Sequence, residues 1–424
     1  MKKFLPLLLL GLFPLTSIAA WDEQLTLNDV SAFSHVNSSD WTSVQSNQAV
    51  LLLSSPLSAW ARFETQAAFS FLDSNNNPYA VPNLPVPNMT VDFLSFSFSG
   101  TAPLGKDSWG NWFVGRGVQS DLTGWVLNSR VDGASMNWQF GKQRLGFEGY
   151  YTGLVATQNS LVQVSNQDYV DSSSYYSWGS SPLIFQFAPK RVIGMLNYRY
   201  AELFARQDLN LQVLGQWDLR SSGDVHTLYY TAQLSGPLSP LNYDLYVTAS
   251  TLVGTVSTGW SALGGARVTW NFPGTGWTAQ AEGLYTHRLT SNAADGFVPI
   301  SDRGPSLVLS TLSLWNVAEA GLGASFRPAS HAEFGLKVDS LFQTTPENQN
   351  LNAAGANGVY QAVVQNLDPN NTQPYLGTEG TFYGTWDFTS EWSLGITAAG
   401  FLPSGAFTDS NVIWLAALAA SLKI

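Results

Sequence analysis

The last residues of the chain decide the fold, and they read Val412-Ile-Trp-Leu-Ala-Ala-Leu-Ala-Ala-Ser-Leu-Lys-Ile424. Every second residue from Val412 to Ile424 is apolar and falls on one face, whereas the other face carries smaller residues and Lys423. Alternation with a period of two is typical of a strand with one apolar side. The preceding segment, 392–399, alternates in the same way, so the C-terminus predicts two successive strands.

Working back from this end, eighteen alternating segments lie between residues 25 and 424. Strands of soluble sheets have about five or six residues, whereas a tilted strand needs about 9 to 11 to cross a bilayer. The segments are long enough to cross, and their even number suits a bacterial barrel. We therefore expect an all-β fold, a transmembrane antiparallel up-and-down β-barrel of about 18 strands. Segment 25–35 has the weakest alternation. Without it, an even number of strands would require the loss of one more, so 16 strands is the alternative. Segment 306–327 is taken as one strand.

The connections between these segments form two series. If the first strand starts at the periplasm, every second connection is short, as at Pro237–Pro240, Pro273–Thr275 and Thr389–Ser390. The other series holds all the long connections, which are 73–87, 119–129, 156–189, 291–305 and 343–373. Short periplasmic turns and longer external loops are typical of outer-membrane barrels. The series therefore predict which end of the barrel faces the periplasm.

Tryptophan residues gather near the short turns. They are Trp60, Trp138, Trp270, Trp277, Trp386 and Trp392. Outer-membrane barrels carry aromatic girdles at the membrane interfaces. The alternative, tryptophans scattered through the core of a soluble sandwich, does not account for the difference in turn length.

The composition excludes several classes of protein. Aromatic residues make up 13% of the 424 residues, too many for a disordered chain, and a formal charge of −11 argues against a nucleic-acid binder. No apolar run after the N-terminus is long enough for a membrane helix. Charged residues are only 12% of the chain, about half the usual share of a soluble domain. We therefore expect lipid, rather than water, on much of the surface.

Residues 1–20 have the pattern of an export signal. Lys2 and Lys3 precede the apolar run Phe4–Leu15, and small residues follow at Ala19 and Ala20. The alternative, a membrane anchor, would need a longer run. The mature chain then has 17 basic and 30 acidic residues, a net charge of −13, and no cysteine. No linker composition interrupts it, so residues 21–424 are predicted to form a single barrel domain.

If the apolar faces meet lipid, the opposite faces line the lumen. The charged residues on those faces are the pore-lining candidates, namely Arg62, Glu64, Arg144, Glu148, Arg191, Arg199, Arg267, Glu282, Arg288, Glu319, Lys337, Asp339, Glu379 and Asp387. Asp244 and Glu333 fall on the same faces, which makes seven basic and nine acidic residues. An 18-stranded barrel is too wide for side chains to fill, so a lining of mixed charge predicts a hydrated channel.

Catalytic patterns are missing from the sequence. It has four histidines, but no Gly-x-Ser-x-Gly elbow, no His-x-x-x-His pair and no cysteine. We therefore expect no enzyme, no metal site and no cofactor.

The C-terminal third resembles the alginate-export-like family of outer-membrane β-barrel porins. The matching stretches are Tyr375-Leu-Gly-Thr-Glu-Gly380, Gly384-Thr-Trp-Asp387, 391–399 and Gly400-Phe-Leu-Pro-Ser-Gly-Ala-Phe407. A weaker similarity covers Val114-Gly-Arg-Gly117 and Arg130-Val-Asp-Gly-Ala134. The resemblance implies a barrel with a passive transport role. It departs in two respects: the lumenal charges are mixed, whereas alginate exporters are electropositive inside, and the chain ends in Ile424 rather than Phe or Trp.

These patterns together predict an outer-membrane channel for passive passage of small hydrophilic solutes or saccharides. The alternative is a surface-exposed adhesin or structural barrel whose lumen is plugged by loops 156–189 and 343–373. The expected partners are the lipid bilayer, lipopolysaccharide, small polar or carbohydrate solutes and the outer-membrane assembly machinery, with no nucleic acid.

Overall fold

The structure is a computed structural model. It describes residues 21–37, 40–75, 88–105, 108–156, 160–162, 164–165, 168, 176–177, 184–185, 187–204, 206–220, 224–254, 258–288, 296–301, 314, 317–344, 373–407 and 411–424. The predicted export signal, 1–20, and most of loop 343–373 lie outside these residues. In the described part of the chain, no helix has the length and apolarity needed to cross a membrane.

Eighteen strands form one closed antiparallel sheet, and two short strands pair only with each other. The sheet consists of β1 (Asp22–Asn37), β2 (Asp40–Ser58), β3 (Ala61–Asn75), β4 (Asn88–Gly105), β5 (Ser108–Ser120), β6 (Asn128–Phe140), β7 (Gln143–Tyr151), β10 (Arg191–Phe204), β11 (Gln207–Asp218), β12 (Val225–Leu238), β13 (Leu241–Gly254), β14 (Thr258–Asn271), β15 (Trp277–Arg288), β16 (Val317–Ala329), β17 (Ala332–Gln343), β18 (Tyr375–Asp387), β19 (Trp392–Pro403) and β20 (Ile413–Lys423). The separate pair is β8 (Tyr176–Ser177) and β9 (Ile184–Phe185).

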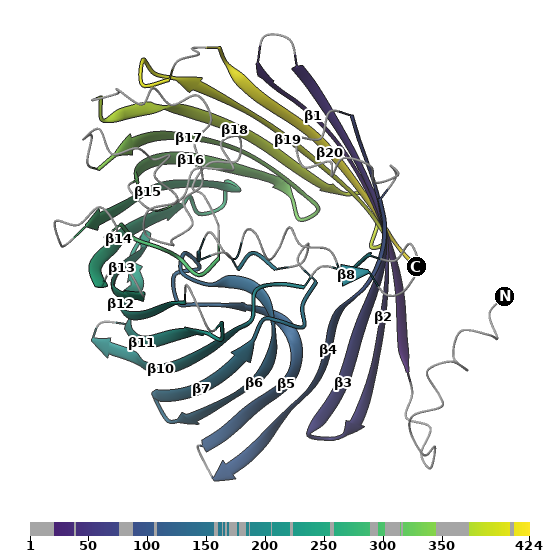
Figure 1. The fold of residues 1–424 in the computed structure, drawn as a ribbon, viewed down its shortest axis with the longest axis vertical. Coiled ribbons are helices and arrows are strands. Elements are labelled where there is room, and N and C mark those ends of the chain that lie inside the picture. Colours follow the sequence, from purple (N-terminus) through teal and green to yellow (C-terminus); the bar gives the residue numbers. More distant parts are fainter. Residues whose placement is uncertain are drawn as a thin grey trace.

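Closure joins the two ends of the chain. β1 pairs with β20 from Thr26 opposite Lys423 to His35 opposite Trp414, and Figure 1 shows these strands side by side. The predicted count of 18 strands is confirmed, and the 16-stranded alternative is wrong because the first strand completes the barrel.

The lengths of the connections differ between the two ends of the barrel, as predicted. At one end of the barrel, the turn end, no connection exceeds five residues, whereas the other end, the loop end, carries connections 152–190, 289–316 and 344–374. Some predicted bounds are wrong. The strand expected at 306–327 begins only at Val317, because Leu314 is already buried in the apolar cluster inside the barrel.

The outer face carries the large apolar side chains. Leu322, Leu336 and Ile396 are exposed on it, alternating along their strands with inward residues. Near the turn end, Trp270 stacks on Phe272 with ring centroids 4.5 Å apart, and Trp277 stacks on Phe326. An apolar belt with aromatic residues at its edge is the arrangement of a barrel that spans a bilayer.

Candidate functional site in the barrel lumen

Inward-facing residues form two layers along the barrel axis. Toward the loop end they are apolar and buried, as at Leu284 on β15 and Leu341 on β17. Two residues closer to the turn end, the same strands carry Glu282 and Asp339. Because side chains alternate with a period of two, both kinds lie on the inner face of the strand. The apolar layer therefore lies nearer the loop end. The inward charged residues next to it, such as Glu282 and Asp339, are here called the charged belt and lie nearer the turn end.

Segments of three loops contribute to the apolar layer. Their buried residues in the common cluster include Val126, Leu127, Val162, Val164, Phe297, Val298 and Ile300. Hydrogen bonds hold these segments together, since the Ile300 amide donates to the Val126 carbonyl at 2.8 Å and the Tyr229 hydroxyl donates to the Val298 carbonyl at 2.6 Å. The described segments of these loops therefore lie in the lumen and pack on the inner wall.

Asp121 shapes one of these inward segments. Its carboxylate accepts hydrogen bonds from the amides of Thr123, Val126 and Leu127 and from the Thr123 hydroxyl, at 2.5 to 3.0 Å. Burial raises the pKa of Asp121 above its ordinary value, although these donors act in the opposite direction. The turn that results points Val126 and Leu127 into the apolar layer.

A buried ion cluster, here called the loop latch, ties connection 152–190 to the wall. It consists of Arg191, Asp168, Asp218 and Arg220. The Arg191 Nη2 atom lies 2.7 Å from Asp168 Oδ2 and 3.0 Å from Asp218 Oδ2, and the Arg191 and Asp168 side chains are 0% exposed. Arg220 contacts both carboxylates as well. The prediction that Arg191 lines the pore is wrong, because its side chain is 0% exposed and is enclosed by partners that include Asp168 and Asp218.

A second cluster, here called the lysine cluster, lies in the charged belt. The Lys337 Nζ atom is 2.5 Å from Glu282 Oε1, 3.1 Å from Glu319 Oε1 and 3.0 Å from Asp339 Oδ1. Arg267 Nε adds an ion pair of 3.1 Å to Glu282 Oε2. Four neighbouring strands, β14 to β17, therefore direct five charged groups toward one point of the lumen.

A glycine makes this convergence possible. Glu282 on β15 and Asp339 on β17 both lie opposite Gly321 on the intervening strand β16. A Cβ atom on Gly321 would lie 2.3 Å from Asp339 Oδ1 and 3.2 Å from Glu282 Cγ. The missing side chain leaves the space in which carboxylates from non-adjacent strands reach the same ammonium group.

Other charged residues of the belt lie on the wall formed by β6, β7, β10 and β11, where hydrogen bonds and ion pairs hold them. Glu148 accepts hydrogen bonds from the Tyr150 hydroxyl at 2.6 Å and the Asn197 amide nitrogen at 2.7 Å. The Arg144 Nε atom donates to Asn137 Oδ1, and Arg199 forms an ion pair of 2.5 Å with Asp208. These side chains pair locally with their neighbours.

The remaining pore-lining candidates lie at different positions along the barrel axis. Arg62 donates to Ser54 Oγ at 2.7 Å, and Glu64 lies half-buried on the same inward face of β3. Glu379 faces Asp339 across β17 and β18 and is nearly fully buried. Asp387 ends β18 at the turn end. Arg288 ends β15, and its side chain is outside the described set.

The sequence patterns did not identify several residues that the structure brings to these clusters. Asp168 and Asp218 belong to the loop latch, Asp208 pairs with Arg199, and the Gln212 amide donates to Asn197 Oδ1 at 2.7 Å. Asp168 falls in connection 156–189, which the sequence predicts to be an external loop, and nothing local in the sequence indicates its burial. Asp208 and Asp218 lie at even-numbered positions of β11, the inward-facing set, so alternation along this strand is a usable signal for them.

Two motifs of the family resemblance meet in the structure. Arg116 on β5 pairs with Asp132 on β6: its Nε atom donates to Oδ1 at 2.8 Å and its Nη2 atom donates to Oδ2 at 3.0 Å. Asp132 alternates with Val131, which is buried in the apolar layer. The ion pair therefore lies on the outer face of the barrel, away from the charged belt.

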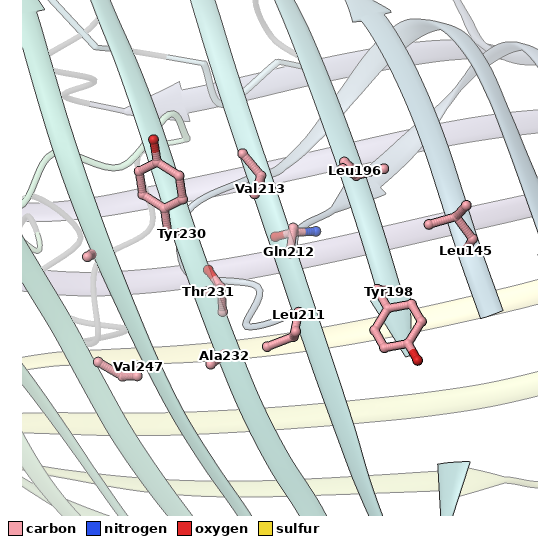
Figure 2. A pocket seen from close by; sticks show the side chains of 11 residues that line it. Leu145, Leu196, Tyr198, Leu211, Gln212, Val213, Tyr230, Thr231, Ala232 and Val247 are labelled. Carbon is pink, nitrogen blue, oxygen red and sulfur yellow. The ribbon is translucent and has the colours of Figure 1, made fainter. Parts of the chain in front are cut away.

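An apolar groove of about 390 Å³ also lies on the outer face. Figure 2 shows Leu196, Val213 and Leu211 among the side chains along it. These side chains are exposed residues of the outer belt, so the groove is separate from the lumenal site.

Comparisons with known proteins support the fold. No family model and no curated protein sequence matches the chain. Among solved structures it is similar to Acinetobacter baumannii OccAB2 (TM-score 0.61, 9% identity), covering 95% of this chain and 98% of that one. It is also similar to Pseudomonas aeruginosa OccK5 (OpdH) (TM-score 0.59, 11% identity, 95% and 98% covered) and Pseudomonas aeruginosa OpdQ (TM-score 0.58, 10% identity, 96% and 99% covered). About 95% of the chain thus has the fold of these barrels, and the resemblance to the alginate-export-like family stays a prediction.

Proposed function

We propose that the chain forms an outer-membrane channel for passive passage of small hydrophilic solutes or saccharides. The charged belt supports this function. The inward-facing side chains of Arg267 and Arg199 are 51% and 48% exposed, although both lie inside a closed barrel. Charged groups with that exposure need water around them. A hydrated, charged lumen under an apolar outer belt suits a channel.

The lining residues in this proposal are the thirteen candidates other than Arg191. Their contribution to the pore surface differs. Arg62, Arg199 and Arg267 are exposed, whereas Glu319 and Glu379 are almost fully buried. The resemblance to alginate exporters supports passive transport. The carboxylates of the lysine cluster do not favour a polyanion such as alginate, so we propose smaller solutes.

A structural or adhesive barrel with a plugged lumen is the second candidate. The inward-folded segments that contain Val126, Val162 and Ile300 support it, because they occupy part of the lumen near the loop end. Such a barrel would gain conductance when these segments are released, whereas a working channel conducts with them in place.

Reconstitution of the purified protein into planar lipid bilayers tests the proposal. We expect discrete conductance steps, and we expect liposomes that contain the protein to swell in small sugars. An empty bilayer with the same detergent is the control. If the folded protein gives no conductance steps and no swelling, the channel function is wrong and the plugged barrel is favoured.

Other features of the proposal concern export and assembly. We propose that residues 1–20 are removed on export and that residues 21–424 insert as one domain, with lipopolysaccharide and the assembly machinery as partners. We propose no enzymatic role. His226 supports this view. Its Nδ1 atom accepts a hydrogen bond from the Asp218 amide at 3.1 Å, and its Nε2 atom lies 3.0 Å from Asp224 Oδ2, so both ring nitrogens already have partners.

A further inference from the structure

We propose that the lysine cluster is a binding site for the primary ammonium group of a permeating cationic solute. The inference rests on the proposed channel function and names the class of solute that the charged belt selects. Three observations carry it: the charge of the wall, two buried carboxylate oxygens, and access from the lumen.

The wall formed by β14 to β18 carries an excess of negative charge. Its inward-facing charged residues in the belt are Arg267, Glu282, Glu319, Lys337, Asp339 and Glu379. Four carboxylates therefore face two cations. On the wall that includes β7, β10 and β11, by contrast, Arg144 and Arg199 balance Glu148 and Asp208. A local excess of one sign raises the concentration of ions of the other sign in a confined lumen.

Two oxygen atoms of the cluster accept no hydrogen bond from any described residue. They are Glu319 Oε2 and Asp339 Oδ1, and both are buried. The Asp339 atom forms an ion pair of 3.0 Å with Lys337 Nζ. The carboxylates of Glu282, Glu319 and Asp339 offer ligand atoms within 4.8 Å of one another. Buried acceptors without a donor cost free energy, and an ammonium group brings three donors.

The position of Lys337 favours an organic ammonium over a resident metal ion. Its Nζ atom already contacts all three carboxylates, so a divalent metal would have to bind beside a positive charge. A primary ammonium is chemically equivalent to Nζ and can replace it while the carboxylates stay paired. The Lys337 side chain is 31% exposed and sits on a flexible stem, so its ammonium can withdraw into the lumen.

Binding of 1,4-diaminobutane to the folded protein in detergent tests this site without relying on conductance. Isothermal titration calorimetry on the full mature chain should detect the diamine. Glu319→Gln keeps the shape of the side chain and removes one carboxyl group, and we expect about a tenfold loss of affinity, which corresponds to 1.4 kcal/mol. The matched control is Glu333→Gln, on an inward position of the same wall but paired with Arg327 at the turn end, where affinity should not change.

The reversal potential in a salt gradient gives a second readout. The unmodified channel should prefer cations, and Glu319→Gln should lower that preference while Glu333→Gln changes it less. If Glu319→Gln does not fold, Asp339→Asn serves for the same comparison. Tight binding of Ca²⁺ alone, or diamine binding that neither variant changes, would overturn the site. Diamine binding without conductance would support the binding site and contradict the channel function. Conductance without diamine binding would support the channel function and contradict the binding site.

Discussion

The loop latch and the lysine cluster use similar chemistry in different surroundings. Each places one long basic side chain between carboxylates from segments that are far apart in the sequence. Arg191 and Asp168 in the latch are completely buried, whereas Lys337 keeps 31% of its side chain exposed. The latch has two cations, Arg191 and Arg220, for two carboxylates, and the lysine cluster has more carboxylates than cations.

This difference assigns the two clusters different roles. Arg191, Asp168 and Asp218 are too buried to contact a solute, so the latch fixes Asp168 and the neighbouring described residues against the wall. An exposed set with excess charge influences the ions that pass it. Burial and charge balance, rather than residue type, therefore separate a structural ion pair from a functional one in this barrel.

Removing Arg191 should have the largest effect on stability. Arg191→Met leaves Asp168 and Asp218 buried with only Arg220 beside them, and loss of one partner of a buried ion pair costs about 3–5 kcal/mol. Urea unfolding followed by tryptophan fluorescence in detergent measures the change. Arg199→Met is the matched control, because its ion pair is half-exposed and should change stability by about 0–1 kcal/mol. Equal effects of the two variants would contradict the structural role of the latch.

Asp121 holds the inward segment 121–127 through hydrogen bonds from its backbone amides and the Thr123 hydroxyl. Asp121→Ala removes an acceptor from three backbone amides and a hydroxyl, and we expect a loss of roughly 2–4 kcal/mol, since unpaired buried donors are costly. Urea unfolding again measures it. Asp224→Ala, whose carboxylate is part-exposed beside His226, is the control. A stability change no larger than that of Asp224→Ala would show that the segment is held mainly by apolar packing.

Gly321→Ala tests the space in which the lysine cluster forms. The added Cβ would meet Asp339 Oδ1 and Glu282 Cγ, so we expect a loss of about 1–3 kcal/mol and an altered reversal potential. Gly323→Ala is the control, because a Cβ there makes only ordinary contacts, the nearest at 3.5 Å. An unchanged selectivity in Gly321→Ala would mean that the convergence of the carboxylates is not needed for it.

Arg267→Glu should have the smallest effect on stability, about 0–1 kcal/mol, because its side chain is half-exposed. It adds negative charge beside Glu282, so the reversal potential should move further toward cation selectivity. Measurement in a KCl gradient checks this, with Arg327→Glu at the turn end as the control. An unchanged potential in Arg267→Glu would remove this residue from the conduction path.

The alternation of side chains predicted much of the site. It assigned Glu282, Glu319 and Lys337 to inward faces, because a strand repeats every two residues regardless of its neighbours. It did not show that Lys337 contacts carboxylates on two other strands, since that depends on register and on the space at Gly321. Arg191 was misplaced for a related reason: alternation gives the direction of a side chain, but not what a distant loop brings to it.

The sequence by itself determined the closed barrel, its 18 strands, the turn end and the apolar outer face. These properties follow from local periodicity and from the lengths of the connections, and both can be read directly from the sequence. Only the tertiary structure decided the content of the lumen. Burial, exposure and ion pairing of the charged groups depend on how loop residues such as Val162, Val164 and Ile300 pack inside the barrel. Contacts between residues more than a hundred positions apart leave no local pattern.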